Sequence, residues 1–475
     1  MSAVAAPARA APAPRAGRFA PRVEHAFAAV LLLGAVGLWA LTRTYPNYDS
    51  YYHLVWGREL LAGLRPSFEA YSAPTEHPLW IALCAVLGLV GEDADRLLVL
   101  VCLLAHAALI FGTYRVGADV FGRWPGLLAA AFVGASASFL LYAARGYVDS
   151  PFLALVVWAA AFEAARPGRF ALSGGLLALA GLLRPEAWVL AGLYAVWGWR
   201  RAEPRERAIL AGALVLPPLL WGVVDASVTG DPLHSFHATT ELADELNRER
   251  GIGAVPGAFV SFVGATVRPP VAALALAGAV IAWWHPGRQA LRVPVALFAC
   301  GVATFVGTGI LGLSIIPRYL TVPAVALCLP AGWLVTRSRV LLALAVVAGL
   351  AFVVVRADAF GRLATELRFI RSTHDGLTAI LRTPEVRAGR RCGPVTLPNY
   401  RLVPDTRWVL DATQRQVGSR SARPRRHGVA LLLVGDKLLR RYGFADGASP
   451  KTNTPPDGFL RGPRRGGFTA YIRCA

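Results

Sequence analysis

Lysine is almost absent from this sequence of 475 residues, where it occurs only as Lys437 and Lys451. Charge as a whole is scarce, because only 16% of the residues are charged whereas 55% are hydrophobic. Long apolar runs recur from about residue 25 to residue 356, and a soluble core does not need so many of them. The composition therefore excludes an ordinary soluble enzyme and predicts an α-helical polytopic membrane protein.

The basic residues are nearly all Arg, and the net charge is +20. Such a charge could indicate nucleic-acid binding, but in a polytopic membrane protein loop arginines set the orientation and contact anionic lipid. We therefore expect anionic membrane lipids as partners and no nucleic acid. The bias toward Arg, with abundant Ala, Gly and Val, suggests a GC-rich bacterial genome and hence the inner membrane of a bacterial cell.

No cleavable signal peptide is evident at the start of the sequence. Residues 1–24 are rich in Ala, Pro and Arg, which predicts a disordered cytoplasmic tail before a first helix that stays in the membrane. This interpretation places the N-terminus in the cytoplasm.

Cysteine is rare, with six in the whole chain. Four lie in apolar segments and are expected to be small core residues: Cys84, Cys102, Cys300 and Cys328. The other two, Cys392 and Cys474, lie in the terminal region. If that region faces the oxidising side of the membrane, we expect them to form a disulfide.

Apolar runs stop at about residue 357, so residues 357–475 are expected to form a small soluble domain outside the cytoplasm. The pattern predicts an α/β unit with a helix near 358–383 and strands at 394–398, 429–434 and 468–474. The domain is strongly basic. It could recognise an anionic acceptor or rest on anionic headgroups, and the second is favoured.

The apolar runs between residues 25 and 356 predict eleven membrane spans. They lie near 25–42, 96–114, 124–142, 151–165, 170–184, 187–199, 208–226, 269–284, 293–314, 319–335 and 339–356. Residues 78–90 are too short to cross comfortably and predict a re-entrant or interfacial helix. With this threading, arginine is much denser in the inner loops than in the outer ones, as the positive-inside rule requires. The hairpin of 170–184 and 187–199 is short, so its tip is expected below the outer surface.

The threading collects polar residues on the outer face. The first outer loop (43–95), the long outer loop (226–268) and the turns between spans contribute Asp49, His53, Glu76, His77, Arg145, Asp149, Arg184, Glu186, His234, His237, Arg318 and Tyr319. A single charge at a helix end is ordinary as a headgroup anchor. Several charges beside apolar helices on one face indicate a polar cavity, because an unpaired charge at membrane depth is costly.

This set of residues permits one kind of chemistry in particular. A carboxylate on a tyrosine-rich loop can take a proton from a hydroxyl. Arginines at membrane depth can bind a phosphate in a bidentate manner and neutralise a leaving group. The set therefore suits transfer from a lipid phosphate to a hydroxyl.

Several motifs resemble those of the GT-C membrane glycosyltransferases that use polyprenyl-phosphate sugars. "YDSYYHLVWGRELLAGLRPSFEAYSAPTEHPLWIAL" is similar to the family's first outer loop, and "RGYVDSPFLAL", "GLLRPEAWVLA" and "IPRYLTVP" are similar to its later landmarks. "EAYSAPTEHPLW" and "LLRPEAW" resemble the actinobacterial arabinofuranosyl- and mannosyltransferase branch. The resemblance covers about residues 25–356 and implies a GT-C fold.

The resemblance also implies roles for single residues. Asp49 would be the general base of an inverting transfer from a polyprenyl-phosphate sugar to a cell-envelope acceptor. Arg318, with Arg184 and Tyr319, would bind the donor phosphate. The expected contacts with donor or acceptor come from His53, His77, Glu76, Asp149, Arg145, Glu186 and His237. Two of these have a simpler alternative: His77 could make a helix-start hydrogen bond, and Glu186 could simply pair with Arg184.

Other functions remain as alternatives. Relatives often carry adjacent acidic residues in the first loop, and here Asp49 stands alone, so no metal site is assigned, although a divalent cation remains possible. His234 and His237 lack an evident third ligand for zinc. A transporter or flippase of a lipid-linked substrate is the main rival, although no internal repeat is evident. A noncatalytic scaffold is the third possibility, and the sequence leaves the sugar and the acceptor open.

Overall fold

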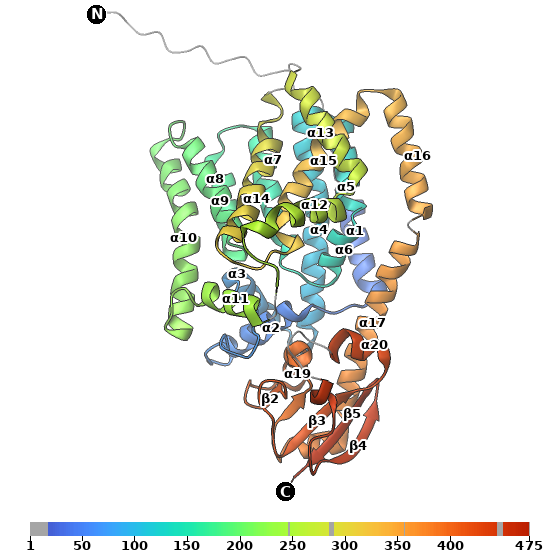
Figure 1. Cartoon of the computed structure of the whole chain (residues 1–475). Coiled ribbons are helices and arrows are strands. Elements are labelled where there is room, and N and C mark those ends of the chain that lie inside the picture. Colours follow the sequence, from blue (N-terminus) through green and yellow to red (C-terminus); the bar gives the residue numbers. More distant parts are fainter. Residues whose placement is uncertain (1–17, 246–247, 285–288, 356, 444–449, 475) are drawn as a thin grey trace, which may run out of the picture.

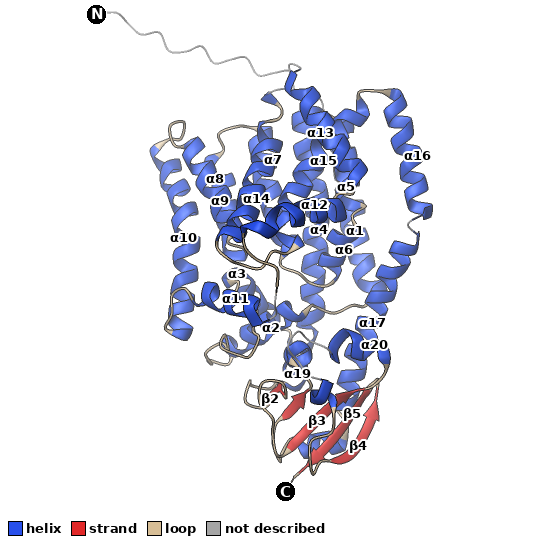
Figure 2. Ribbon diagram, viewed as in Figure 1, coloured by secondary structure: helices blue, strands red, loops and turns tan. Residues whose placement is uncertain are grey.

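The computed structural model describes residues 18–245, 248–284, 289–355, 357–443 and 450–474. A bundle of helices carries a small α/β domain at one end (Figure 1). The strands are confined to that domain, as Figure 2 shows. Most of the expected cytoplasmic tail, residues 1–17, lies outside the described residues.

The helices of the bundle follow the apolar runs of the sequence closely. Their bounds are α1 Pro21–Thr42, α2 Tyr48–Leu61, α3 Pro78–Gly88, α4 Ala94–Phe121, α5 Arg123–Gly134, α6 Ala137–Ala144, α7 Asp149–Ala165, α8 Phe170–Leu183, α9 Glu186–Gly198, α10 Pro204–Thr229, α11 His234–Glu245, α12 Val255–Thr266, α13 Pro269–Trp284, α14 Arg292–Ile310, α15 Thr321–Thr336 and α16 Arg339–Val355. A short 3₁₀ turn, Pro317–Leu320, precedes α15.

Five described helices are long and apolar enough to cross a membrane, or up to seven if each bent pair counts as one span. The chain is therefore an integral membrane protein, but the count of eleven spans stays a prediction. The expected span at 124–142 is bent by 61° between α5 and α6. The loop expected at 226–268 contains two helices, α11 and α12.

The short helix α3 packs along α2 on the same side of the bundle as the α/β domain (Figure 1). Gly57 of α2 makes this close crossing possible, because a Cβ atom there would lie 2.5 Å from the main-chain nitrogen of Ala85. The hairpin of α8 and α9 is also short, and its tip at Arg184 and Glu186 is buried inside the protein, where bent backbone is tolerated.

Helices α1 and α4 run antiparallel and give the bundle its two ends. Phe19 lies beside Tyr114 near the end of α4, whereas Trp39 donates to the carbonyl of Arg96 near its start. The start of α1 and the α/β domain therefore lie at opposite ends of the bundle (Figure 1). This arrangement agrees with the expected threading but does not say which end faces the cytoplasm.

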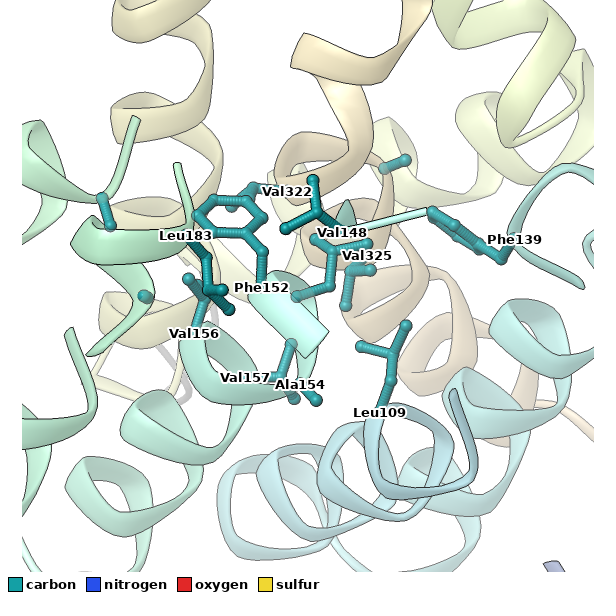
Figure 3. Close-up of a cluster of buried hydrophobic side chains, with 14 of the residues drawn as sticks. Leu109, Phe139, Val148, Phe152, Ala154, Val156, Val157, Leu183, Val322 and Val325 are labelled. Carbon is teal, nitrogen blue, oxygen red and sulfur yellow. The ribbon is translucent and has the colours of Figure 1, made fainter. Parts of the chain in front are cut away.

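The core of the bundle is formed where α4, α6, α7, α8 and α15 meet. Figure 3 shows Leu109, Phe152, Leu183 and Val322 among the side chains that fill it. Phe152 is 2% exposed and Leu109 is 1% exposed. This packed layer fixes the ends of α7 and α8, which carry polar residues described below.

The terminal domain begins with α17 (Ala357–Leu381), α18 (Pro384–Gly389) and α19 (Val403–Leu410). Its sheet consists of β1 Val395–Leu397, β2 Val417–Ser419, β3 Gly428–Leu433, β4 Leu460–Arg465 and β5 Phe468–Arg473, in the order β2-β1-β3-β5-β4. β1 pairs in parallel with β2 and β3, and β5 is antiparallel to β3 and β4. A disulfide joins Cys392 to Cys474.

Candidate active site

Asp49 occupies the first turn of α2, and its position is fixed by the residue before that helix. The side chain of Asn47 accepts hydrogen bonds from the main-chain nitrogens of Asp49 and Ser50, at 2.8 and 3.2 Å. This is a standard N-cap. Asn47 also donates to the carbonyl of Arg145 at 3.0 Å, so the start of α2 is attached to the turn between α6 and α7.

Arg145 supports this turn from the other side. Its guanidinium donates to the carbonyls of Tyr45 and Pro46 at 2.9 and 2.8 Å. Arg145 was expected to contact donor or acceptor. In the structure these two hydrogen bonds hold the backbone before α2. The structure therefore gives it a structural task at the edge of the site.

Arg318 lies between two carboxylates from distant parts of the sequence. Its Nη1 is 3.3 Å from Oδ2 of Asp49 and 3.6 Å from Oδ2 of Asp149. The side chain of Asp149 is fully buried, whereas those of Asp49 and Arg318 are 32% and 25% exposed. The cluster is therefore open to solvent at Asp49 and Arg318 and closed at Asp149.

Arg184 closes the inner side of the cluster. It forms ion pairs with Asp149 and with Glu186, where Nε lies 2.9 Å from Oε1. Its guanidinium also lies over the ring of Tyr319, 5.3 Å from the centroid. The predicted pairing of Glu186 with Arg184 is present. We call Asp49, Arg318, Asp149, Arg184 and Glu186 the charge cluster.

The charge cluster forms where the N-terminal ends of several helices meet. Asp49, Asp149 and Glu186 lie in the first turns of α2, α7 and α9, and Arg318 precedes α15. A helix N-terminus stabilises a nearby negative charge. The converging helix ends therefore help to offset three carboxylates that face only two guanidinium groups.

His53 and His77 form a buried pair behind Asp49. Their rings are stacked with centroids 5.1 Å apart, and Nδ1 of His53 donates to the carbonyl of Asp49 at 2.6 Å. Burial lowers the pKa of His53 to about 4 and that of His77 well below its usual value. Both imidazoles are therefore neutral at neutral pH. The ring of His77 also packs against Trp221, 5.7 Å between centroids.

Glu76 belongs to a second polar cluster, behind the histidines. The hydroxyl of Ser235 lies 2.6 Å from Oε2 of Glu76 and 3.0 Å from Oδ1 of Asp225, and it accepts a hydrogen bond from Nε1 of Trp221 at 2.8 Å. His234 lies beside it, with Nε2 3.5 Å from Glu76. One hydroxyl proton cannot serve two carboxylates, and a proton on one carboxyl would complete the hydrogen bonding. Burial raises the pKa of Glu76 to about 7, so we assign this proton to Glu76.

His237 lies apart from both clusters. Its side chain is half exposed and its Nδ1 is 2.6 Å from Asp231. Among the described residues, no three His, Cys, Asp or Glu side chains lie close enough together to hold a metal ion.

The sequence alone did not reveal Asn47, Tyr147, Asp225 or Ser235. Tyr147 supports Arg318, whose guanidinium lies 5.2 Å from the ring centroid. The motif "YPNYD" does contain an N-cap signal, since Asn two residues before Asp49 is a preferred cap. Asp225 and Ser235 were hidden because their partner Glu76 lies some 150 residues away in the sequence.

The charge cluster as a whole combines a solvent-accessible carboxylate with a cation at the same opening. Asp49 can accept a proton from a bound hydroxyl, and Arg318 can turn toward an anionic oxygen. The buried side of the cluster keeps Arg318 in place, because Asp149 is itself held by Arg184.

The sequence matches no protein-family model and no curated protein. Among solved structures, ArnT from Cupriavidus metallidurans in the apo state has a TM-score of 0.56 at 14% identity, covering 94% of this chain and 98% of that one. ArnT bound to undecaprenyl phosphate has a TM-score of 0.52 at 14% identity, covering 95% and 97%.

An oligosaccharyltransferase from Archaeoglobus fulgidus, tethered to an acceptor peptide, has a TM-score of 0.52 at 11% identity. The match covers 96% of this chain and 74% of that one. These neighbours are glycosyltransferases of the GT-C fold, so this chain shares the GT-C fold. At such low identity the likeness speaks for the fold alone, and the actinobacterial branch stays a prediction.

Proposed function

We propose that this chain is a membrane glycosyltransferase that moves a sugar from a polyprenyl-phosphate donor to a hydroxyl of a glycan, lipid or protein acceptor outside the cytoplasm. The observation that carries the proposal is the contact of Arg318 with Asp49 at the open end of the charge cluster, 3.3 Å between Nη1 and Oδ2. The GT-C neighbours include one bound to undecaprenyl phosphate, a ligand of the proposed donor class.

The proposed reaction is a single displacement. The acceptor oxygen attacks the anomeric carbon while the bond from that carbon to the phosphate oxygen breaks, so the configuration inverts. Asp49 takes the acceptor's proton, and the bond electrons leave with polyprenyl phosphate. Arg318 stabilises the charge that grows on the leaving phosphate, while Arg184 and Tyr319 hold the cluster behind it.

The shared contact of Arg318 gives the donor an effect on the base. In the structure Arg318 interacts with Asp49. When a donor phosphate attracts this guanidinium, the carboxylate of Asp49 is released from the ion pair and can face the acceptor hydroxyl. Donor binding would thus free Asp49 only when a sugar is in place.

The proposal includes the expected topology. The protein would lie in a bacterial inner membrane with its N-terminus in the cytoplasm and the α/β domain outside. The disulfide between Cys392 and Cys474 supports this orientation, because disulfides persist in oxidising compartments. Labelling of both ends in intact cells would check it.

The direct test is transfer by the purified protein from radiolabelled polyprenyl-phosphate sugars, with mannose and arabinofuranose donors first, to membrane glycan acceptors. We expect Asp49→Asn to lose roughly 10²–10⁴-fold of the activity with its thermal stability retained. Asp436→Asn, at an exposed position of the α/β domain, is the matched control. Full activity of Asp49→Asn would refute this base. If no donor is used, flipping of lipid-linked sugars in liposomes tests the rival transporter function.

A further inference from the structure

The α/β domain binds α2, whose first turn carries Asp49, through two arginines. One arginine lies on α2 and the other lies on α19. Arg58 reaches from α2 to the C-terminal end of α19. Its guanidinium donates to the carbonyls of Arg407 and Trp408 at 2.8 and 3.0 Å, and its Nε is 2.9 Å from Asp411. It also lies over the ring of Trp408, 4.8 Å from the centroid. Arg58 thus caps α19, because the last carbonyls of a helix lack partners within it.

Arg407 reaches back from α19 into the first outer loop and is fully buried. Its Nη2 donates to Oε1 of Glu59 at 2.6 Å and its Nη1 donates to the hydroxyl of Ser67 at 2.9 Å. Glu59 in turn accepts from the nitrogen and hydroxyl of Ser67, at 2.8 and 3.1 Å. We call Arg58, Glu59, Ser67 and Arg407 the interface cluster.

The α/β domain also contacts α2 near its start. The hydroxyl of Tyr51 lies 3.1 Å from Nδ1 of His374 in α17. Tyr400 packs edge-on against Tyr48, the residue before Asp49, with centroids 5.5 Å apart. Burial lowers the pKa of His374 to about 4, so this contact is made by a neutral imidazole at neutral pH.

The helix α2 is therefore held from several sides. Asn47 attaches its start to the bundle, α3 packs along it, and the interface cluster attaches its last turn to the α/β domain. The first and last of these points are about twelve residues apart, or about 18 Å along a helix. Without the interface cluster, α2 can tilt or slide against α3, and Asp49 would move relative to Arg318.

We propose that the α/β domain is a working part of the active site and that Arg407 is a positioning residue for Asp49. This inference rests on the proposed function of Asp49. It gives the domain a task different from contact with lipid headgroups, which the basic composition favoured. A shift of about 1 Å in a reacting group can cost roughly 10²-fold in rate, so a small tilt of α2 is enough to matter.

The competing explanation is that the interface cluster only stabilises the protein. A buried ion pair is by itself weak evidence for stability or for function. The two explanations differ in what Arg407→Met does to a protein that remains folded. Loss of positioning speeds amide exchange in α2 more than in the rest of the α/β domain and lowers the turnover number. Loss of stability alone speeds exchange in both alike and leaves the turnover number unchanged.

The test compares hydrogen exchange of the full-length protein and three variants in detergent micelles. In Arg407→Met we expect amide exchange in residues 48–61 to become at least tenfold faster relative to exchange in residues 428–433 of β3, which reports any global loss of stability. Glu59→Gln should show a smaller increase, because its amide keeps part of the hydrogen bonding. Arg461→Met, at an exposed position of β4, should match the wild type.

The same variants are then assayed for transfer. We expect Arg407→Met to lower kcat by 10- to 100-fold with the KM for the donor unchanged within threefold, and Arg407→Lys to recover part of kcat. Unchanged exchange in residues 48–61 would overturn the proposal, and so would faster exchange with an unchanged kcat. If Arg407→Met does not fold, Glu59→Gln decides by the same criteria. Because exchange needs no substrate, a wild type that transfers no sugar refutes the proposed function separately from the attachment of α2.

Discussion

The charge cluster and the interface cluster are built from the same groups, arginines and carboxylates at helix ends, but they differ in access. In the charge cluster the side chains of Asp49 and Arg318 are 32% and 25% exposed. In the interface cluster the carboxylate of Glu59 and its partner Arg407 are 10% and 1% exposed, and only Arg58, at 23%, reaches the solvent. The open cluster can exchange an internal partner for a ligand, whereas the closed one can only hold two elements together. In this protein the charge cluster differs from the interface cluster in its access to solvent and not in the kind of residue it contains.

The largest effect should come from removing the buried arginine of each cluster. Arg184→Met leaves Glu186 unpaired and Asp149 with only the longer contact to Arg318, and Arg407→Met leaves Glu59 unpaired, so each should lower the free energy of unfolding by about 3–5 kcal/mol. Thermal unfolding in micelles measures this loss, with Arg461→Met as the control. The double variant Glu59→Met with Arg407→Met should regain most of the stability, since both buried charges are gone. An Arg184→Met protein as stable as the wild type would mean that the charge cluster is hydrated.

The next largest effect is the change in stability with pH that comes from Glu76. Its pKa is raised from 4.5 to about 7 by burial, so between these values the unfolded chain loses a proton that the folded protein keeps. Stability should therefore fall as pH rises from about 4.5 to 7 and level off above it, by roughly 3–3.5 kcal/mol in all.

Glu76→Gln should remove this part of the pH dependence, because the amide does not titrate. Melting temperatures from pH 5 to pH 8 compare the variant with the wild type, and Glu241→Gln, at an exposed position of α11, is the control. Parallel pH profiles for Glu76→Gln and the wild type would show that Glu76 is not the proton holder of the second polar cluster.

Arg318→Lys should weaken transfer by about 10- to 100-fold in kcat, or roughly 1.4–2.7 kcal/mol. Lysine keeps the charge but loses the planar fork that reaches Asp49, Asp149 and a phosphate together. Transfer at saturating donor measures this loss. Arg339→Lys, exposed at the start of α16, should keep full activity, and equal turnover by both variants would remove Arg318 from the proposed mechanism.

The smallest effect is expected at the cap of α2. Asn47→Ala removes the acceptor for two main-chain nitrogens and should cost about 1 kcal/mol. Local hydrogen exchange at residues 48–51 should rise while residues 57–61, held by the interface cluster, change little. Thr240→Ala, at a half-buried position of α11, is the control. Equal increases at both ends of α2 would argue against two separate attachment points.

Much of the fold was predictable because apolar runs report membrane helices directly. The expected segments near 269–284 and 339–356 agree with α13 and α16 within a residue. The bend between α5 and α6 was harder to predict, because Ala135 and Ser136 do not break a helix strongly. The two helices inside 226–268 were missed because turn residues and charges interrupt their short apolar stretches.

The candidate site was predictable in its residue types but not in its contacts. The motif around Asp49 and the "IPRYL" stretch indicated both members of the Asp49–Arg318 pair, although 269 residues separate them. The pairing of Glu59 with Arg407 spans 348 residues. Glu59 lies within the first-outer-loop motif, but Arg407 belongs to no motif. A single sequence carries no signal for such contacts, because burial across an interface depends on the finished tertiary structure.

The place of β5 in the sheet has a consequence for biosynthesis. β5 lies between β3 and β4, yet it is the last of the described elements to emerge from the ribosome. The sheet cannot close until this strand has been synthesised and, in the proposed orientation, has crossed the membrane. If the domain lies outside and Arg407 positions Asp49 as proposed, the nascent protein stays inactive until export is complete. A chain whose synthesis stops before β5 would then be inserted in the membrane but would not transfer sugar from the donor lipid.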